Sequence, residues 1–307
     1  MCSLTGPSPL DRAQGALLGL ACGDAVGTAV EFKLRGTFHP ISDMVGGGPF
    51  RLQPGQWTDD TSMALCLAES LLEREGFDPG DQMERYRRWF REGYQSSTGR
   101  CFDVGSTILE ALLRFEETGD PFSGSTEPNR AGNGSLMRLA PVVIFFFPDA
   151  EAVDHYSAES SRTTHGAEEA VGACRILGGI FHGALSGAEK DKLLESVPAA
   201  DWMSSRLREI ASGGYREKAV DQIRATGYAV DTLEAALWSF WTSSSFEEAI
   251  LTATNLGDDS DTTAAICGQV AGAHYGKHAI PEGWLEKLWE GEKIATKASD
   301  LFSSSGG

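Results

Sequence analysis

Apolar residues recur along most of the chain at the spacing of an α-helix. In residues 58–74, for instance, Met63, Leu67 and Leu71 lie four positions apart and fall on one side of a helix. This segment opens with Thr58, a residue type that favours the N-cap position. The same periodicity predicts helices at 11–26, 58–74, 82–92, 106–117, 150–160, 166–185, 231–241, 246–253 and 262–275.

One segment alone has the composition of a β-strand. It is PVVIFFF, at 141–147, and the chain offers no second alternating run with which it could pair. Because a sheet needs several strands, we interpret this segment as part of a buried helix. The polar residues at 118–132 indicate a loop, and 186–230 is irregular and charged.

These patterns predict an all-α fold with a single compact multi-helix domain. Asp11 is expected to cap the first helix. No Pro- or Ser-rich linker divides the chain, so the domain is expected to span 1–307, with a motif-bearing core at about 11–295. Both termini, including the tail SDLFSSSGG, are expected to be frayed.

Glycine is more frequent here than in average proteins, with 36 residues. Many of these glycines lie inside helical patterns, as in VGACRILGGIFHGAL (171–185) and ICGQVAGAHYG (266–276). Glycine weakens a helix, so its use there indicates places where helices cross closely.

The charge of the chain excludes one class of partner. Lys and Arg number 26 against 44 Asp and Glu, which gives a net charge of −18. Without a basic run, such a chain repels phosphates, and we expect no direct nucleic-acid binding. The same acidity makes a divalent cation a plausible partner.

Cysteine usage and the ends of the chain indicate a soluble cytoplasmic protein. None of the six cysteines forms a CxxC pair, and most lie in apolar helical contexts, as expected for buried reduced thiols. The N-terminus lacks the basic and apolar regions of a signal peptide. The run APVVIFFF (140–147) is too short to span a bilayer, so no membrane association is expected. The oligomeric state stays open.

Two predicted helices begin with clusters of aspartate, in TDDT (58–61) and in NLGDDSDTT (255–263). Acids in a first helical turn are favourable, so Asp59 and Asp60 can be explained as helix-end charges. Asp258, Asp259 and Asp261 cannot all serve in this way. If the two clusters meet, their charges repel at low dielectric, and divalent cations would relieve that repulsion.

Carboxylate and hydroxyl oxygens suit Mg²⁺ or Mn²⁺. A binuclear site of this kind polarises a substrate oxygen and activates water. Sequence spacing alone does not establish that the two clusters meet. The candidate ligands of two divalent cations are Thr58, Asp59, Asp60, Asp259, Asp261 and Thr262.

Six motifs in order resemble the ADP-ribosylglycohydrolase family, especially its bacterial dinitrogenase reductase-activating branch. They are GALLGLACGDAVGTAVEF (15–32), TDDT (58–61), CFDVGST (101–107), GNGSLMRLAPV (132–142), THG (164–166) and NLGDDSDTT (255–263).

The resemblance implies an all-helical enzyme with a binuclear Mg²⁺/Mn²⁺ centre formed by the same six ligands. It also implies cleavage of the bond between ADP-ribose and an acceptor, with an ADP-ribosylated protein as substrate and ADP-ribose as product. Arginine is the expected acceptor; serine, small molecules and nucleic acid are alternatives, as is a non-catalytic relative that serves as a crystallin. The family usually has Gly at position 258, and Asp258 can bind metal, lie exposed or alter the acceptor side.

Three acids outside the ligand set have two interpretations each. Asp24 falls on the apolar face of its helix, where it can bond backbone amides of a following turn or support the metal site. Glu31 can be a surface residue; the resemblance places it on a mobile loop over the active site. Asp103 can cap the helix that begins near Ser106; the resemblance places it beside the ribose, in proton transfer. The candidate catalytic residues are Asp103, Glu31 and Asp60.

The segment GNGSLMR (132–138) predicts a glycine-containing turn that leads into a helix. Backbone N–H groups at such a turn can hold a diphosphate, although Asn-Gly is commonly only a turn. Arg138 can instead be an ion-pair partner. The family often has Asn at the position of Ser106. With the resemblance taken into account, the candidate substrate-binding residues are Asp24, Gly105, Ser106, Asn133, Gly134, Ser135, Met137 and His165.

Overall fold

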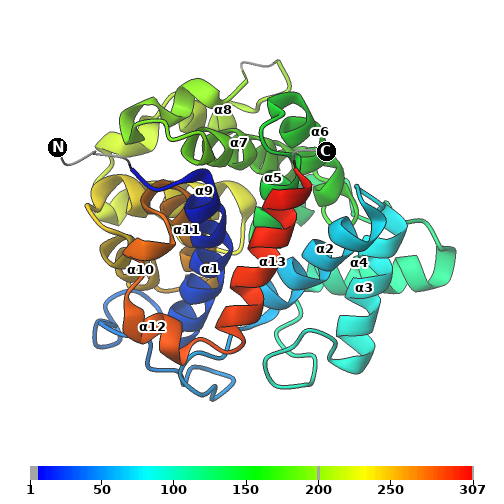
Figure 1. Cartoon of the computed structure of the whole chain (residues 1–307), viewed down its shortest axis with the longest axis horizontal. Helices are drawn as coiled ribbons and strands as arrows, with labels where there is room; N and C mark the ends of the chain where they lie inside the picture. Colours follow the sequence, from blue (N-terminus) through cyan, green and yellow to red (C-terminus); the bar gives the residue numbers. More distant parts are fainter. Residues whose placement is uncertain (1–5, 199–200, 306–307) are drawn as a thin grey trace.

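The computed structural model describes residues 6–198 and 201–305. Its secondary structure is helical, with isolated bridges and no strand in the described part of the chain, so the all-α prediction is confirmed. Figure 1 shows the helices gathered around α1 and α11. The helices are α1 (Pro9–Gly27), α2 (Asp59–Arg74), α3 (Pro79–Glu92), α4 (Ser106–Thr118), α5 (Ala140–Phe146), α6 (Ala150–Arg162), α7 (Glu168–Leu185), α8 (Ser205–Ala211), α9 (Ala229–Thr242), α10 (Phe246–Thr254), α11 (Ser260–Tyr275), α12 (Glu282–Lys287) and α13 (Gly291–Ser304).

The start of α1 corrects the predicted cap. Ser8 is the N-cap residue, because its hydroxyl accepts a 3.1 Å hydrogen bond from the amide of Asp11. Pro9 follows at the first helical position, where its missing N–H costs nothing. Asp11 therefore lies in the first turn and is not the cap.

The apolar run at 141–147 is helical, as predicted. It forms most of α5, and its residues from Pro141 to Phe145 are buried. Flanking helices surround this segment, which explains why both of its sides are apolar. Composition alone resembled a strand because buried helices and buried strands are equally apolar.

The C-terminal part of the chain departs from the prediction. α12 and α13 were not predicted, and the tail expected to fray is helical as far as Ser304. Leu301 is fully buried and Ile294 packs beside it in the core. Residues 306 and 307 lie outside the described part. Ile294, Ala298 and Leu301 do fall at helical spacing, and the helix was missed because the polar tail that follows them was expected to fray.

Glycines allow α1 and α11 to cross at backbone contact. A Cβ at Gly19 would overlap the carbonyl oxygen of Gly268, and a Cβ at Gly268 would overlap that of Gly19. Real Cβ atoms do not approach other atoms so closely. The crossing is antiparallel, so the C-terminal end of α1 lies beside the N-terminal end of α11. It thereby places Asp24 next to the acidic residues at the start of α11.

We expect Gly268→Ala to destabilise the protein by at least about 3 kcal/mol, because the added methyl must push two backbones apart. Thermal or urea unfolding measures this loss. Gly283→Ala is the matched control: Gly283 is also helical, and nothing lies within 4 Å of an added Cβ. The control should be neutral or slightly stabilising. Equal unfolding midpoints for the two variants would contradict the close crossing.

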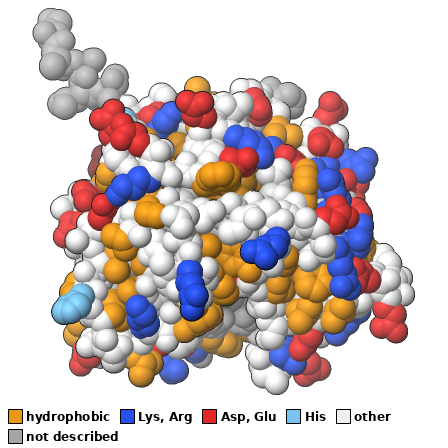
Figure 2. All heavy atoms as spheres, turned by 90° about the horizontal axis from the view of Figure 1, so that it is seen from below, with side chains coloured by type: hydrophobic (Ala, Val, Ile, Leu, Met, Phe, Trp, Pro, Cys, Tyr) orange, Lys and Arg blue, Asp and Glu red, His pale blue; other side chains and the backbone are white. Residues whose placement is uncertain are grey.

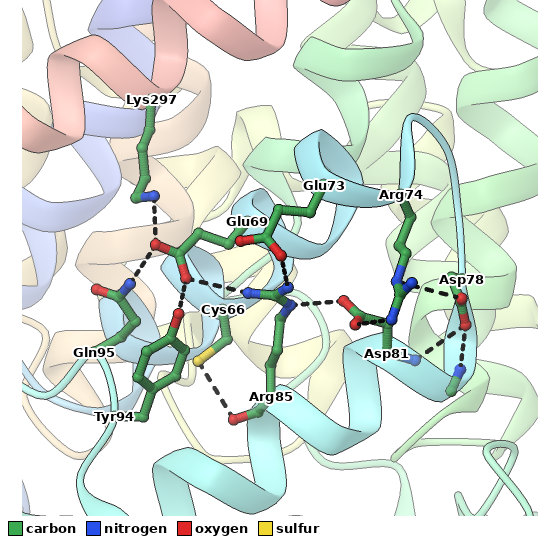
Figure 3. Close-up of polar contacts among 11 residues, drawn as sticks. Cys66, Glu69, Glu73, Arg74, Asp78, Asp81, Arg85, Tyr94, Gln95 and Lys297 are labelled. Atoms are coloured by element: carbon green, nitrogen blue, oxygen red, sulfur yellow. Dashed lines mark hydrogen bonds and ion pairs between the residues drawn. The ribbon is translucent and has the colours of Figure 1, made fainter.

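A polar network ties α2, α3 and α13 to the loop that leads to Asp103 (Figure 3). Glu69 of α2 accepts hydrogen bonds from Gln95 at 2.6 Å, Lys297 at 2.6 Å and Arg85 at 3.3 Å, and from the Tyr94 hydroxyl. Charge-assisted bonds of this kind are among the stronger polar contacts. The network therefore fixes the start of the loop at 93–105 against α2.

One segment in the described part of the chain is long and apolar enough, by length and composition alone, to cross a membrane. The segment Pro9–Val30 has the length and hydropathy of a membrane span, but 94% of its most apolar window is buried inside the protein. A central core helix has these properties too. In Figure 1, α1 lies between α10 and α13, and it also packs against α11.

The described cysteines are free thiols, as predicted. Cys22, Cys66, Cys174 and Cys267 are buried, and Cys101 is half-buried. Burial raises the pKa of the Cys101 thiol to about 12, which disfavours its reactive thiolate form.

Candidate active site

The predicted site residues gather around one cavity of about 300 Å³. Its walls come from Glu31 and Phe32 in the loop after α1, from the N-terminal ends of α2, α4 and α11, and from the turn at 132–137. Of the residues predicted from the sequence, those that line it are Glu31, Asp59, Asp103, Gly105, Ser106, Asn133, Gly134, Met137, His165, Asp259, Asp261 and Thr262.

The two acidic clusters meet. The hydroxyl of Thr58 lies 3.5 Å from an oxygen of Asp261, and that of Thr262 lies 3.5 Å from an oxygen of Asp60. These contacts join the N-terminal ends of α2 and α11. The sequence left this meeting open, because it depends on how two distant helices pack.

The N-cap interpretation of Thr58 requires correction. Thr58 occupies the cap position of α2, but its side chain does not cap the helix. Its hydroxyl is directed instead at Asp24, at 3.0 Å. The side chain that accepts hydrogen bonds from the amides at the start of α2 is that of Asp24, which belongs to α1.

Asp24 holds the start of α2, and with it Asp59 and Asp60, by hydrogen bonds. It is fully buried and accepts hydrogen bonds from the amides of Thr58 and Thr61 at 2.8 and 3.0 Å and from both hydroxyls. Both of its carboxylate oxygens are therefore occupied. Asp24 does not line the cavity. Its hydrogen bonds agree with the interpretation that it binds backbone amides of a following turn, whereas its support of a metal site stays a prediction.

Three carboxylate oxygens near the cavity are buried without a hydrogen-bond partner among the described residues: Glu31 Oε2, Asp60 Oδ1 and Asp261 Oδ1. An unpaired buried carboxylate oxygen is costly. No Lys, Arg or His forms a salt bridge with these acids in the described part of the chain. The protein alone thus leaves the cluster uncompensated.

The pKa values of these acids are raised. Burial raises the pKa of Glu31 to about 9 and of Asp103 to about 7, with nearby carboxylates adding to the effect. Burial, followed by neighbouring carboxylates, also raises the pKa of Asp59, Asp60 and Asp261 well above the usual range. Perturbed groups of this kind concentrate at functional sites.

The carboxylates form two groups with metal-ligand spacing. Oxygens of Asp24, Asp60 and Asp261 lie within 4.8 Å of one another, and so do oxygens of Glu31, Asp103 and Asp261. The two groups share Asp261, which is an arrangement suited to two neighbouring cations. Since Asp24 is saturated by hydrogen bonds, the unpaired oxygens of Asp60, Asp261 and Glu31 fit the cations best.

Asp59, Asp259 and Thr262 also line the cavity. They lie outside the two carboxylate groups that have metal-ligand spacing. One oxygen of Asp259 accepts a 2.8 Å hydrogen bond from the side-chain amide of Asn133. This bond links the acidic cluster to the glycine-containing turn.

The turn at 132–137 is shaped by glycine and by His165. A Cβ at Gly134 would lie 2.8 Å from Ile108 and 2.9 Å from the His165 ring, so the turn needs glycine here. The amides of Gly132 and Asn133 already donate to Arg130 and Gly227. That of Gly134, which lines the cavity, has no partner among the described residues, so one N–H group remains there for an anion.

His165 is a neutral side chain in this site. Its Nδ1 lies 2.8 Å from the Thr164 hydroxyl, and burial, then the charge of Arg138, lowers its pKa to about 3. Arg138 forms no ion pair in the described part of the chain; it donates to Gly134 O at 2.8 Å and Thr164 Oγ1 at 2.7 Å. Ser135 lies behind the cavity wall, bonded to Ser161.

Several lining residues were missed by the sequence analysis. Gly227 belongs to the stretch treated as irregular, and it faces the site because its backbone pairs with that of Asn133. An isolated ATGY turn gave little signal. Phe32 is an aromatic residue directly after the candidate Glu31, and this position in the sequence was a usable signal that was not followed. The missed residues are Phe32, Val104, Thr107, Ile108, Gly132 and Gly227.

Several known proteins are similar to this chain in sequence and in fold. An ADP-ribosylglycohydrolase family model matches residues 5–307. The ADP-ribosylarginine hydrolase Tri1 of Pseudomonas putida (strain GB-1) is 48% identical over 98% of this chain and 80% of that protein. The ADP-ribosyl-[dinitrogen reductase] glycohydrolase of Rhodospirillum rubrum is 34% identical over 93% of this chain and 92% of that protein.

A solved structure described as an ADP-ribosylglycohydrolase-related protein complex matches with a TM-score of 0.87 at 46% identity, over 97% of this chain and 99% of that chain. The matches extend over almost the whole chain, and they include the motifs whose side chains meet at the cavity. The chain therefore belongs to the ADP-ribosylglycohydrolase family and is a hydrolase that acts on glycosyl bonds.

Proposed function

We propose that this hydrolase cleaves the N-glycosidic bond between ADP-ribose and the arginine side chain of a protein, and that it requires two divalent cations, Mg²⁺ or Mn²⁺. The observation that carries the cation requirement is the set of unpaired buried oxygens on Glu31, Asp60 and Asp261. Hard oxygen donors without a nearby cationic side chain are the ligands that these metals prefer.

When bound, such cations polarise a substrate oxygen and acidify water at neutral pH. The side chains whose unpaired oxygens would hold them are Glu31, Asp60 and Asp261, with Thr58, Asp59, Asp259 and Thr262 around them. Asp24 keeps the first turn of α2 in place through its four hydrogen bonds. Its role is therefore to position the ligands.

The substrate would be held along the cavity. The free N–H group of Gly134 would bind the diphosphate, and the neutral His165 ring would offer a hydrogen bond without adding charge. The ribose attached to the acceptor would then lie toward the carboxylates. This orientation directs the glycosidic bond to Asp103 and Glu31.

Asp103 suits proton transfer at its carboxyl group. Its pKa of about 7 lets the group both hold and release a proton near neutral pH. It would donate to the departing guanidine nitrogen and accept a proton from water. Glu31, with a pKa of about 9, would stay protonated until a cation or substrate changes its surroundings.

Arginine is favoured as the acceptor by the relatives that act on it. Two proteins named ADP-ribosylarginine hydrolase are 48% and 46% identical to this chain, whereas an ADP-ribosylhydrolase ARH3 is 26% identical. A cationic guanidinium also suits an acidic cavity. A non-catalytic role is disfavoured because the carboxylate cluster is intact and uncompensated.

The acceptor is tested by comparing two substrates in the presence of Mg²⁺. We expect ADP-ribose release from an arginine-ADP-ribosylated protein at least about a hundredfold faster than from a serine-ADP-ribosylated one, since an acceptor-side pocket built for one hydrogen-bonding group rejects another strongly. Chromatographic quantification of free ADP-ribose measures both rates. Faster release from serine would contradict the proposed acceptor and leave the reaction class intact.

A further inference from the structure

Two exposed apolar side chains stand beside the cavity. Phe32 is 66% exposed and Leu34 is 64% exposed, and Phe32 also lines the cavity. Single exposed apolar residues are common, but Phe32 directly follows Glu31 at the mouth of the site and Leu34 comes two residues later. The loop between α1 and α2 lies at the lower end of Figure 1, and Figure 2 shows hydrophobic side chains exposed on that end among Lys and Arg.

The backbone that presents Phe32 is held in an unfavourable conformation. Phe32 has φ of 62°, in the left-handed region that bulky residues avoid; Asp258, with φ of 54°, is of a type that enters this region more readily. The two residues are joined directly: the amide of Phe32 donates to Asp258 O at 2.7 Å, and the amide of Asp258 donates to Lys33 O at 2.8 Å. Strain of this kind is typically retained at functional sites.

The loop is further anchored by Arg35. Its guanidinium donates to Leu256 O at 3.1 Å, to Ile223 O at 2.8 Å and to Val220 O. Gly257 lets the two segments approach, because a Cβ there would lie 2.5 Å from Lys33 O. Phe32 and Leu34 are therefore presented on a fixed platform, which reduces the entropy cost of binding a partner.

Asp258 adds an unpaired charge to this platform. Its carboxylate is half-buried and has no hydrogen-bond or salt-bridge partner within 6–198 and 201–305. It belongs to neither carboxylate group with metal-ligand spacing and does not line the cavity. Of the three roles left open for Asp258 by the sequence, an acceptor-side role fits these facts best.

The platform lies at the acceptor end of the cavity. The glycine-containing turn and His165 form the end proposed for the diphosphate, and Glu31 and Asp103 form the end proposed for the scissile bond. Phe32 adjoins the second end as the chain neighbour of Glu31, and Asp258 adjoins Phe32 through their backbone hydrogen bond. The acceptor side of the substrate, beyond the glycosidic bond, would therefore lie beside Phe32 and Asp258.

We propose that Phe32, Leu34 and Asp258 form a docking surface for the polypeptide that carries the modified arginine. The apolar side chains contact residues that flank the arginine, and the Asp258 carboxylate pairs with the guanidinium, whose charge is complementary. This inference rests on the proposed function, since it requires an arginine acceptor at this end of the cavity.

The test compares kcat/KM for two substrates: an arginine-ADP-ribosylated protein and ADP-ribosylarginine, the free amino acid conjugate. Leu34→Ala should lower the ratio of protein to free-conjugate kcat/KM by about tenfold, the effect of losing one well-packed interface side chain. Asp258→Asn should lower kcat/KM for both substrates by about tenfold, because both carry the guanidinium.

Leu10→Ala is the matched control. Leu10 is also an exposed leucine, at 40%, but it lies at the opposite end of α1 from Phe32, and its ratio should equal that of the wild type. A Leu34→Ala ratio within twofold of the wild type would overturn the docking surface. Wild-type protein that releases ADP-ribose from neither substrate would instead overturn the proposed function itself.

Discussion

Asp60→Asn is expected to reduce ADP-ribose release by about a thousandfold or more, on the scale of losing one preorganised electrostatic group in a buried site. Asp60 is fully buried, and its Oδ1 has no hydrogen-bond partner in the described part of the chain. Asn keeps the shape of the side chain but offers a neutral and weaker ligand. Steady-state release from an arginine-ADP-ribosylated protein measures the loss.

The fold of this variant should survive, which separates loss of chemistry from loss of structure. The substitution removes one of several buried like charges, so in EDTA the variant should unfold at the same temperature as the wild type or higher. Asp300→Asn is the matched control, because Asp300 is exposed on α13 and should leave activity unchanged. Activity of Asp60→Asn within tenfold of the wild type would contradict the role given to Asp60.

The second expected result concerns stability in EDTA, which should fall as pH rises from about 4 toward about 9. The carboxyl groups of Glu31 and Asp103 have pKa values of about 9 and about 7 in the folded protein, above their ordinary values. Between the ordinary and the raised pKa, the folded chain binds more protons than the unfolded chain. The free energy of unfolding therefore decreases as pH rises through that window.

Cation binding should remove this loss. A ligand at a hundred times its Kd stabilises the folded state by about 2.7 kcal/mol, and cations compete with protons for the same oxygens. Mg²⁺ or Mn²⁺ should thus raise the melting temperature by several degrees at pH 8 and by less at pH 5. Glu31→Gln should flatten the pH dependence in EDTA. Melting temperatures that change neither with pH nor with added cation would contradict a buried, uncompensated acidic cluster.

Helices with long apolar periods were predictable from the sequence. The row of Met63, Leu67 and Leu71 located α2, and all three side chains are buried. The absence of a partner for 141–147 was enough to assign a helix there. In contrast, α13 was not predicted, because the polar tail was expected to fray. Its apolar residues Ile294, Ala298 and Leu301 nevertheless fall at helical spacing and are buried where α13 packs against α1, α2 and α5.

The acidic residues of the site were also predictable by residue type, but their roles were not. Asp24 was identified as unusual because a carboxylate on an apolar helix face is unfavourable. Only the packing of α1 against α2 shows that both of its oxygens bind Thr58 and Thr61. Gly227 and Phe32 reach the cavity through backbone pairing between distant segments, which leaves little trace in the local sequence.

The most direct test of the account measures bound metal and ADP-ribose release in the same sample. Metal-free protein is mixed with an arginine-ADP-ribosylated protein, and Mn²⁺ is added stepwise while bound ions are counted and free ADP-ribose is quantified. We predict no release in EDTA, and release that rises as two cations bind per chain. Full release in EDTA, or release that is unrelated to bound metal, would contradict the account.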